Sequence, residues 1–216
     1  MAQSSRKKPT VVLFVRHGRT PTTGQVLPGR AKGLHLGDEG VAQAERAAAR
    51  IGALGKRRVK AVYASPMERT RETAAPIAAA LDQRVKIERG LLEADFGKWT
   101  GRKLADLYKR PEWEQVQKYP SGFRFPEGES FPEMQQRMVG AIHKLVAAHP
   151  GQTIVAVSHA DPIKAAVANA MGTHLDLFQR IVVGPCSISA IIYGFGGPTV
   201  LAVNSMGDDL KALVPS

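Results

Sequence analysis

Residues 11–20 of the chain read Val-Val-Leu-Phe-Val-Arg-His-Gly-Arg-Thr, an apolar run that passes directly into a charged turn. An uninterrupted apolar run of this length, rich in β-branched and aromatic residues, is typical of a strand that is covered on both faces in a parallel sheet. The run therefore predicts a strand over 11–15 and places Arg16 and His17 immediately after its carboxyl end.

The rest of the chain alternates between short β-branched runs and longer alanine-rich segments. This alternation predicts a three-layer α/β/α fold with a mostly parallel central sheet. All of the expected strands are poor in polar alternation, so we expect each to be covered on both faces. Strands are expected at 11–15, 59–64, 153–157, 187–193 and 199–203, and helices at 39–54, 66–81, 131–148 and 162–171.

The chain divides into a short tail and one domain. Residues 1–9 are basic and end in Pro9, which suggests a flexible tail, and residues 10–216 have the size of a single domain. The segment 88–128 is rich in Gly, Pro, Trp and charge. We expect it to be an excursion over the sheet and the active site rather than a part of the strand–helix alternation.

Three helix starts carry local signals. Ser65-Pro66-Met67-Glu68 and Ser130-Phe131-Pro132-Glu133 both have the Ser-x-x-Glu pattern of a capping box, in which serine caps the first turn and glutamate bonds back. Asp161-Pro162 is a plausible cap followed by a first-turn proline. These signals predict helices that begin at Pro66, Phe131 and Pro162.

Composition limits the class of protein. Of 216 residues, 44% are hydrophobic and 23% charged, as in an ordinary globular protein, and no apolar run approaches the ~20 residues that cross a bilayer. No signal-peptide core follows the basic start, and the single cysteine, Cys186, forms no internal disulfide. We therefore expect no membrane partner and a cytoplasmic location.

The net charge of +11 favours phosphate-bearing partners of some kind. The basic residues are scattered, with short clusters at 6–8 and 56–58, and no basic stripe is interleaved with aromatic residues. Since base-stacking platforms need such aromatic residues, nucleic acid is not expected as the partner. A small phosphorylated substrate is the expected partner, and a homodimer is left open.

Three of the expected strands end in polar or charged residues. Arg16 and His17 follow the first strand, Ser65 and then Arg69 follow the second, and His159 follows the strand at 153–157. Ligands of open α/β sheets bind at the carboxyl ends of the strands, so we expect one shared site. Two histidines and two guanidinium groups suit a tetrahedral dianion better than a metal, and no metal or cofactor is expected.

In these motifs the sequence resembles the histidine phosphatase superfamily, branch 1, which includes cofactor-dependent phosphoglycerate mutases and α-ribazole phosphatase. The matching pieces stand in the family's order and extend from about residue 10 to 205. They are Arg16-His17-Gly18, the run 65–74, Leu92-Glu93-Ala94-Asp95-Phe96-Gly97-Lys98-Trp99-Thr100-Gly101, and Ser158-His159. The overall run, with Leu27–Arg30 and His174–Phe178, looks like an actinobacterial subgroup of probable phosphomutases. The resemblance implies the phosphoglycerate mutase-like form of the fold.

The resemblance also implies roles for five residues. His17 would attack phosphorus and become phosphohistidine, while Arg16, Arg69 and His159 would surround the equatorial oxygens. His159 serves there only when protonated, which a bound dianion favours. Glu93 would protonate the leaving oxygen and deprotonate water, with Phe96 and Trp99 limiting its solvation, and Asp95 is the alternative acid.

Further phosphate contacts are implied for Thr23, Arg30 and the backbone N–H of Ala160. The chain departs from the family at two of these places. Thr23 stands where the family commonly has asparagine, and Ala160-Asp161 replaces a glycine pair. A threonine hydroxyl can still donate to phosphate, whereas an aspartate beside an anion is unfavourable unless it caps the following helix.

Three functions are compatible with this pattern. The run Ala94–Trp99 looks more like the phosphatase branch than the glycolytic mutases, so we expect hydrolysis of a small phosphomonoester through a phosphohistidine on His17. A phosphoglycerate mutase-type phosphomutase is the alternative. A non-catalytic phosphate- or nucleic-acid-binding module is the third, and the presence of Glu93 argues against it because a binder needs no acid.

Overall fold

Strand β1, Thr10–Arg16, lies inside a mixed sheet in the computed structural model, which describes residues 8–207. The strand order over these residues is β3-β2-β4-β1-β5-β6, and the first four strands run parallel. β5 is antiparallel to β1 and forms a hairpin with β6. The strands are β2 Val59–Ala64, β3 Val85–Ile87, β4 Thr153–Ser158, β5 Ile188–Gly194 and β6 Gly197–Ser205. The mostly parallel sheet is confirmed.

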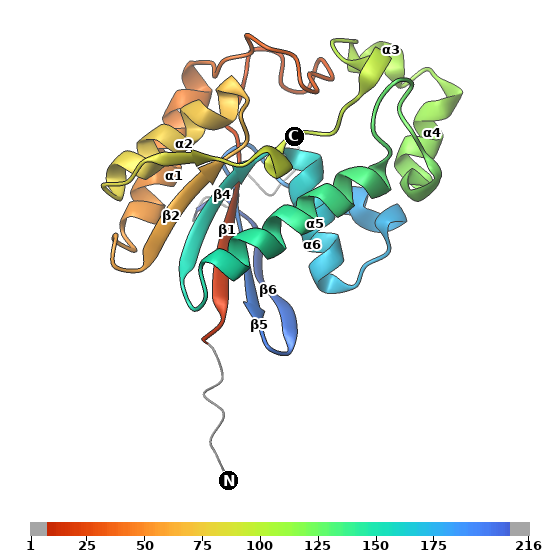
Figure 1. Ribbon diagram of the computed structural model, residues 1–216. Coiled ribbons are helices and arrows are strands. Elements are labelled where there is room, and N and C mark those ends of the chain that lie inside the picture. The colour runs from red at the N-terminus through yellow and green to blue at the C-terminus, as the bar shows by residue number, and fades with distance from the viewer. Residues whose placement is uncertain (1–7, 208–216) are drawn as a thin grey trace.

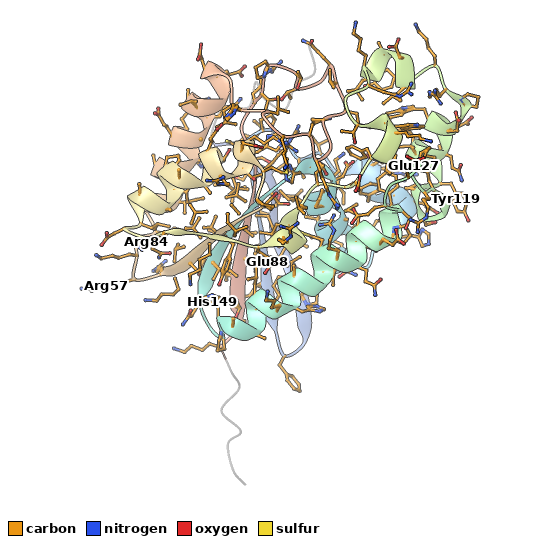
Figure 2. All side chains as sticks on the ribbon, turned by 45° about the horizontal axis from the view of Figure 1, so that its top comes forward. Arg57, Arg84, Glu88, Tyr119, Glu127 and His149 are labelled. Carbon is orange, nitrogen blue, oxygen red and sulfur yellow. The ribbon has the colours of Figure 1, made fainter. Side chains whose placement is uncertain are left out.

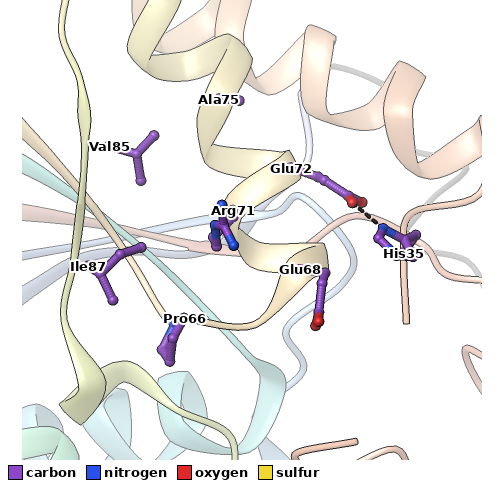
Figure 3. Close-up of a pocket in the computed structure, with 8 residues that line it drawn as sticks. All are labelled: His35, Pro66, Glu68, Arg71, Glu72, Ala75, Val85 and Ile87. Atoms are coloured by element: carbon purple, nitrogen blue, oxygen red, sulfur yellow. Dashed lines mark hydrogen bonds and ion pairs between the residues drawn. The ribbon is translucent and has the colours of Figure 1, made fainter. Parts of the chain in front are cut away.

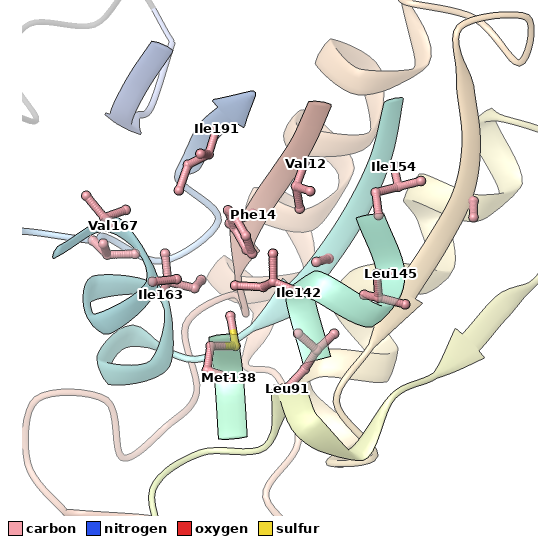
Figure 4. Close-up of a cluster of buried hydrophobic side chains, with 14 residues drawn as sticks. Val12, Phe14, Leu91, Met138, Ile142, Leu145, Ile154, Ile163, Val167 and Ile191 are labelled. Carbon is pink, nitrogen blue, oxygen red and sulfur yellow. The ribbon is translucent and has the colours of Figure 1, made fainter. Parts of the chain in front are cut away.

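Helices cover both faces of the sheet, as Figure 1 shows. Val12 and Phe14 of β1 point to one face, where they pack with residues of α5 (Phe131–Ala148) and α6 (Ala160–Met171) (Figure 4). Leu13 and Val15 point to the other face, toward α1 (Asp38–Gly52) and α2 (Glu68–Ala80). Because successive strand residues alternate between faces, the continuous apolar run of β1 supplies both halves of the core. The three-layer prediction is confirmed.

One of the three predicted helix starts has the predicted capping. The Ser130 hydroxyl accepts from the backbone N–H of Glu133, whose side chain accepts from the N–H of Ser130. The other two starts were wrong. α2 begins at Glu68, because the Ser65 N–H continues the sheet by donating to the Val157 carbonyl, and α6 begins at Ala160 with His159 as its N-terminal flank.

The segment 88–128 contains short helices rather than strands. They are η1 Arg89–Leu91, η2 Gly97–Trp99, α3 Leu104–Leu107, α4 Pro111–Lys118 and η3 Pro120–Gly122. Its aromatic residues form a separate cluster with the start of α5, with α6 and with η4 (Leu175–Arg180). The described members of this cluster include no strand residue, so the part of the segment that contains α3 and α4 packs on helices beside the sheet, at the upper right of Figure 1. Leu91, near the start of the segment, packs instead with Val12 and Phe14 of the sheet.

Two sheet edges differ from expectation. β3 was not predicted, since its three residues give too short a run to stand out. β6 is largely exposed along its length, so the expectation that every strand is covered on both faces was wrong there. The predicted tail lies outside the described residues except for Lys8 and Pro9, and so do residues 208–216.

Among residues 8–207, no helix is long and apolar enough to span a membrane. Figure 2 shows Arg57 and Arg84 at the same side of the molecule, away from Tyr119 and Glu127. Together with Lys56, Lys60 and Lys86 they line one groove.

Candidate active site

The ends of β1, β2 and β4 bring the two histidines together. The His17 N–H donates to the Ser158 carbonyl at 3.0 Å, which fixes the residue after β1 against the last residue of β4. The ring centroids of His17 and His159 are 5.3 Å apart, and both side chains are buried. The expectation that the strand ends converge on one place is met for these two residues.

The imidazole of His17 is held in one tautomer. Its Nδ1 lies 2.8 Å from the carbonyl oxygen of Gly18. A carbonyl oxygen can only accept, so Nδ1 carries the hydrogen and Nε2 keeps its lone pair. Burial, with the charges of Arg69 and Arg16 nearby, lowers the pKa of His17 well below its usual value. A neutral ring with a free Nε2 can act as a nucleophile at neutral pH.

Arg69 connects His159 to the loop that follows His17. Its Nη2 donates to the Gly29 carbonyl at 2.7 Å and to Nδ1 of His159 at 3.1 Å. Nδ1 therefore accepts, and Nε2 of His159 donates to the Ser65 hydroxyl at 2.9 Å. Burial and the neighbouring Arg69 lower the pKa of His159 well below its usual value, so the free protein holds this ring neutral.

Both arginines keep donors for a ligand. Nε of Arg16 and Nε and Nη1 of Arg69 are buried without a hydrogen-bond partner among residues 8–207. Leaving a buried charged donor unpaired is costly, and burial lowers the pKa of both guanidinium groups. An anion with several oxygens would satisfy these donors together, since a guanidinium grips two oxygens at once. The arrangement is that of an anion site.

Glu93 lies within electrostatic reach of both arginines and is 7% exposed. Burial, reinforced by the charge of Asp161 and opposed by Arg69 and Arg16, raises the pKa of its carboxyl to about 7. Phe96 and Trp99, each 2% exposed, belong to the aromatic cluster that follows it in sequence. A carboxyl with this pKa exists in both protonation states near neutral pH, as an acid and base require.

An ionic network that the sequence reasoning missed holds the backbone around Glu93. Arg137 of α5 donates to the carbonyls of Gly90, Leu92 and Glu93 at 2.8, 2.9 and 3.2 Å, and to both carboxylate oxygens of Glu129. Arg30 also donates to the Glu93 carbonyl, at 2.9 Å. This network could not be predicted, because nothing in the sequence places Arg137, in the middle of a long helix, beside Glu93.

Replacing Arg137 by methionine removes the hydrogen bonds that hold the backbone at Glu93, so the Glu93 carboxyl is expected to become less well positioned. We expect about tenfold lower kcat/KM for alkyl phosphates, which need an acid, and little change for p-nitrophenyl phosphate, which does not. Arg124→Met is the matched control, because Arg124 is exposed and pairs with Glu133 away from Glu93. Equal losses on both substrates would show that Arg137 acts on folding alone.

Of the remaining predicted substrate contacts, Thr23 and Arg30 bond to groups of the protein, whereas Ala160 keeps its position at a helix start. The Thr23 hydroxyl pairs with the N–H and the hydroxyl of Thr20. Arg30 is occupied by the Glu93 carbonyl and by the carboxylates of Glu129 and Asp95. Ala160 is the first residue of α6, where backbone N–H groups lack partners within the helix.

Two aspartates differ from their expected places. Asp95, the alternative acid, accepts from the Gly97 N–H at 3.0 Å and is 42% exposed, so it caps a turn. Asp161 was expected to cap α6, but it lies in the first turn and pairs with Lys164 at 3.2 Å. The negative charge of Asp161 raises the pKa of Glu93, and it also acts to raise that of Arg16.

The turn after His17 depends on a close backbone approach. A Cβ added to Gly18 would lie 2.5 Å from the carbonyl oxygen of Gly40 in α1, and the Gly18 N–H donates to the Thr73 hydroxyl at 3.0 Å. Thr73 in turn donates to the Arg69 carbonyl at 2.7 Å. This chain joins the backbone of the His17 turn to that of Arg69.

Gly18→Ala is therefore expected to destabilise the protein by about 1–3 kcal/mol and to lower activity further by displacing His17. The matched control is Gly140→Ala, an exposed position of α5 with nothing within 4 Å of the added carbon. There alanine should stabilise by about 0.5–1 kcal/mol. Thermal unfolding with activity at 25 °C measures both, and an unaffected Gly18→Ala protein would contradict the role of the close approach.

A groove of about 630 Å³ lies between α2 and β3 (Figure 3). It contains none of His17, Glu93 and His159. On its rim His35 forms an ion pair with Glu72, which also accepts from the Leu36 N–H at 2.8 Å. These contacts fasten the loop after His17 to α2, so the groove is adjacent to the site without being part of it.

Comparison with known proteins is consistent with this geometry. Residues 12–206 match the Histidine phosphatase superfamily (branch 1). The chain is 30% identical over 193 residues to phosphoserine phosphatase 1 of Hydrogenobacter thermophilus, covering 83% of this chain and 85% of that protein. It is 31% identical over 185 residues to a probable phosphoglycerate mutase of Cronobacter sakazakii, covering 84% of each.

A solved structure shows the same fold. Phosphoserine phosphatase of Entamoeba histolytica, in complex with 3-phosphoglyceric acid, superimposes with a TM-score of 0.80 at 25% identity, covering 91% of this chain and 97% of that one. Against mycobacterial relatives that are 30% identical over 205 residues, the chain spans 56% of their length. The motifs, the fold and these likenesses agree, and the chain belongs to the histidine phosphatase superfamily, branch 1.

Proposed function

We propose that the protein hydrolyses a small phosphomonoester through a phosphohistidine intermediate on His17. The observation that carries the proposal is the buried group of arginine donors, without a partner among residues 8–207, beside a neutral imidazole whose Nε2 keeps its lone pair. The similarity to proteins named phosphatases supports it. A small phosphorylated substrate and a cytoplasmic location complete the proposal, the location because Cys186 forms no internal disulfide.

In the first step Nε2 of His17 attacks phosphorus in line, so an N–P bond forms while the P–O bond to the alcohol breaks. The free donors of Arg16 and Arg69 hold the equatorial oxygens, where fixed positive charge lowers the barrier. Glu93, protonated, gives its proton to the leaving oxygen. Nδ1 of His17 keeps its hydrogen on the Gly18 carbonyl, which spreads the positive charge that develops on the ring.

His159 changes state when the substrate binds. Its ring is neutral in the free protein, and a phosphate dianion placed beside it raises its pKa, because opposite charge favours the protonated form. When His159 takes up a proton at Nδ1 it no longer accepts from Arg69 and donates there to the anion, while Nε2 stays on the Ser65 hydroxyl. In the second step the Glu93 carboxylate takes a proton from water, an O–P bond forms, the N–P bond breaks, and inorganic phosphate leaves.

Phosphomutase activity is the second candidate, favoured by the likeness to a probable phosphoglycerate mutase. Mutase and phosphatase share the first step and differ in what takes the phosphoryl group. Product analysis with 3-phosphoglycerate separates them. Release of phosphate is expected for the phosphatase, whereas interconversion of 2- and 3-phosphoglycerate much faster than phosphate release would establish the mutase.

A further inference from the structure

The hairpin of β5 and β6 forms one edge of the sheet and carries no charge. Residues 181–207, which include the whole hairpin, contain no Asp, Glu, Lys or Arg, and this is the longest uncharged stretch of the sequence. Six of the nine residues of β6 are nevertheless exposed, and no strand pairs with its outer side among residues 8–207. Exposed edge strands of soluble proteins are usually protected by charged side chains. Burial within one chain therefore does not account for the missing charge.

Large apolar side chains lie along this uncharged edge. Leu201 on β6 is 58% exposed, and the turn between the two strands, which projects below the helices in Figure 1, carries Phe195, which is 95% exposed. Because a strand of nine residues is about 30 Å long, these side chains extend along the whole length of β6. Apolar surface gathered in one place marks an interaction site. We call five exposed side chains the apolar strip: Val182, Phe195, Leu201, Val203 and Met206.

The opposite edge of the sheet has the contrary character. β3 at that edge has only three residues, and Arg84 and Lys86 beside it line the basic groove with Lys56, Arg57 and Lys60. Cations on an edge strand prevent contact with a second edge of the same kind, because the like charges repel. Of the two edges, only the β6 edge is therefore suited to apolar contact.

The charge of the chain indicates which partner covers the strip. A strongly acidic or basic partner is attracted to charges, and the strip has none to offer. Two copies of this chain, each with a net charge of +11, repel each other where their basic residues face, so they can meet only where those residues are absent. The strip is such a place, and a surface that meets its own copy about a two-fold axis is complete in itself. A second copy is therefore the occupant that the charge favours.

The form of the contact follows from the irregular path of β6. Pro198 has no N–H to donate, and the register against β5 shifts on either side of the Ala190–Ala202 pair. These features interrupt the outer row of hydrogen-bonding groups, so a continuous sheet through both copies is not expected. We propose that two copies of the chain associate through the apolar strip, side chain against side chain, and leave the basic groove free. The dimer is independent of the proposed function, since no residue of the anion site belongs to the strip.

The strip also adjoins the segment that supports Arg16. The Gly184 N–H donates to Oδ1 of Asn204 in β6 at 2.7 Å, and Nη1 of Arg16 donates to the Val183 carbonyl at 2.8 Å. Covering the strip would therefore restrict the motion of this segment, and the exchange of the Gly184 amide reports whether the strip is covered.

The first test is sedimentation equilibrium of the wild type at about 50 mM and about 500 mM salt. A dimer is expected, and it should be tighter at the higher salt concentration, because salt screens the repulsion between the two basic copies and does not weaken apolar contact. A monomer at every concentration up to about 1 mM would overturn the proposal. A dimer that weakens with salt would assign the contact to ion pairs and would overturn it as well.

The second test places a charge in the strip. Leu201→Lys is expected to raise the dissociation constant of the dimer by about 100-fold or more, because each dimer loses two buried leucines and gains two facing ammonium groups. Val203→Lys is the second strip variant. Ile87→Lys, on exposed β3, is the matched control and should keep the wild-type dissociation constant. A dimer unchanged in both strip variants, or weakened equally in Ile87→Lys, would overturn the place of the contact.

Hydrogen exchange distinguishes a second copy from other covers. The amides of Gly184 and of residues 197–206 are expected to exchange more slowly in concentrated than in dilute wild-type protein, and at the fast rate in Leu201→Lys at both concentrations. Thermal unfolding of Leu201→Lys checks that the monomer is folded, as expected for a side chain that is exposed in one copy. A monomer in which these amides are already protected would mean that the same chain covers the strip, and the dimer would be wrong.

Discussion

His17→Ala is expected to lower kcat/KM for every phosphomonoester by about 10⁴-fold or more, because removing a nucleophile removes the covalent route itself. The same change should abolish an acid-labile, base-stable phosphoryl label on the protein. The label is measured after brief incubation with ³²P-labelled substrate and denaturation at alkaline pH. The fold should survive, since Phe14, Val15 and the neighbouring strands supply the core there.

His143→Ala is the matched control for this experiment. His143 is exposed on α5, so its loss should leave both label and turnover unchanged. A label that persists in His17→Ala would assign the covalent intermediate to another residue. Full turnover without any label in the wild type would point instead to direct attack by water.

Glu93→Gln is expected to cost about 10²–10⁴-fold in kcat/KM for alkyl phosphates, the range of general acid catalysis, and far less for p-nitrophenyl phosphate. The reason is that p-nitrophenolate leaves without a proton whereas an alkoxide does not. The comparison uses kcat/KM because this quantity reports the first step, whereas the second step, in which Glu93 acts as base, is the same for both esters. Asp95→Asn is the matched control, since Asp95 caps a turn, and it should have a small effect on both esters. Equal losses on both esters in Glu93→Gln would remove Glu93 as the acid.

The pH dependence follows from the same carboxyl. Its pKa is raised to about 7, mainly by burial, and the acid form is the one that protonates the leaving oxygen. The value of kcat/KM for alkyl esters, which reports the first step, should therefore fall as pH rises through about 7, because Glu93 loses its proton there. In Glu93→Gln this decline should disappear from the residual activity, and a decline that remains would belong to another group.

The central features of the fold and of the site could be predicted from sequence. The continuous apolar runs that become β1, β2 and β4 indicate strands covered on both faces, and the polar residues after them had to meet at one sheet edge. The apolar runs and the polar residues that follow them were sufficient for this prediction, because the site is formed at the carboxyl ends of these same parallel strands. The short β3 and the exposed β6 gave weaker patterns.

What could not be predicted depends on contacts between distant segments. Ser65 matched a capping signal, yet its hydroxyl accepts from His159, 94 residues away. Arg30 has the charge of a phosphate ligand, but Glu93 and Glu129 occupy it. The neutral state of His159 depends on burial beside Arg69, which a linear pattern does not contain. In each case tertiary neighbours decide which of several chemically reasonable partners a side chain takes.

Arg16 and Arg69 have buried donors without a partner in the part of the chain that the structure describes, and these donors also affect the stability of the folded state. A buried charged group without a partner costs folding free energy, and an anion that binds only the native state returns it by mass action. At a ligand concentration about 100 times its dissociation constant, this linkage is worth about 2.7 kcal/mol. The melting temperature of the protein then depends on the phosphate or phosphoester in solution, and its lifetime in a cell is coupled to the supply of its own substrate.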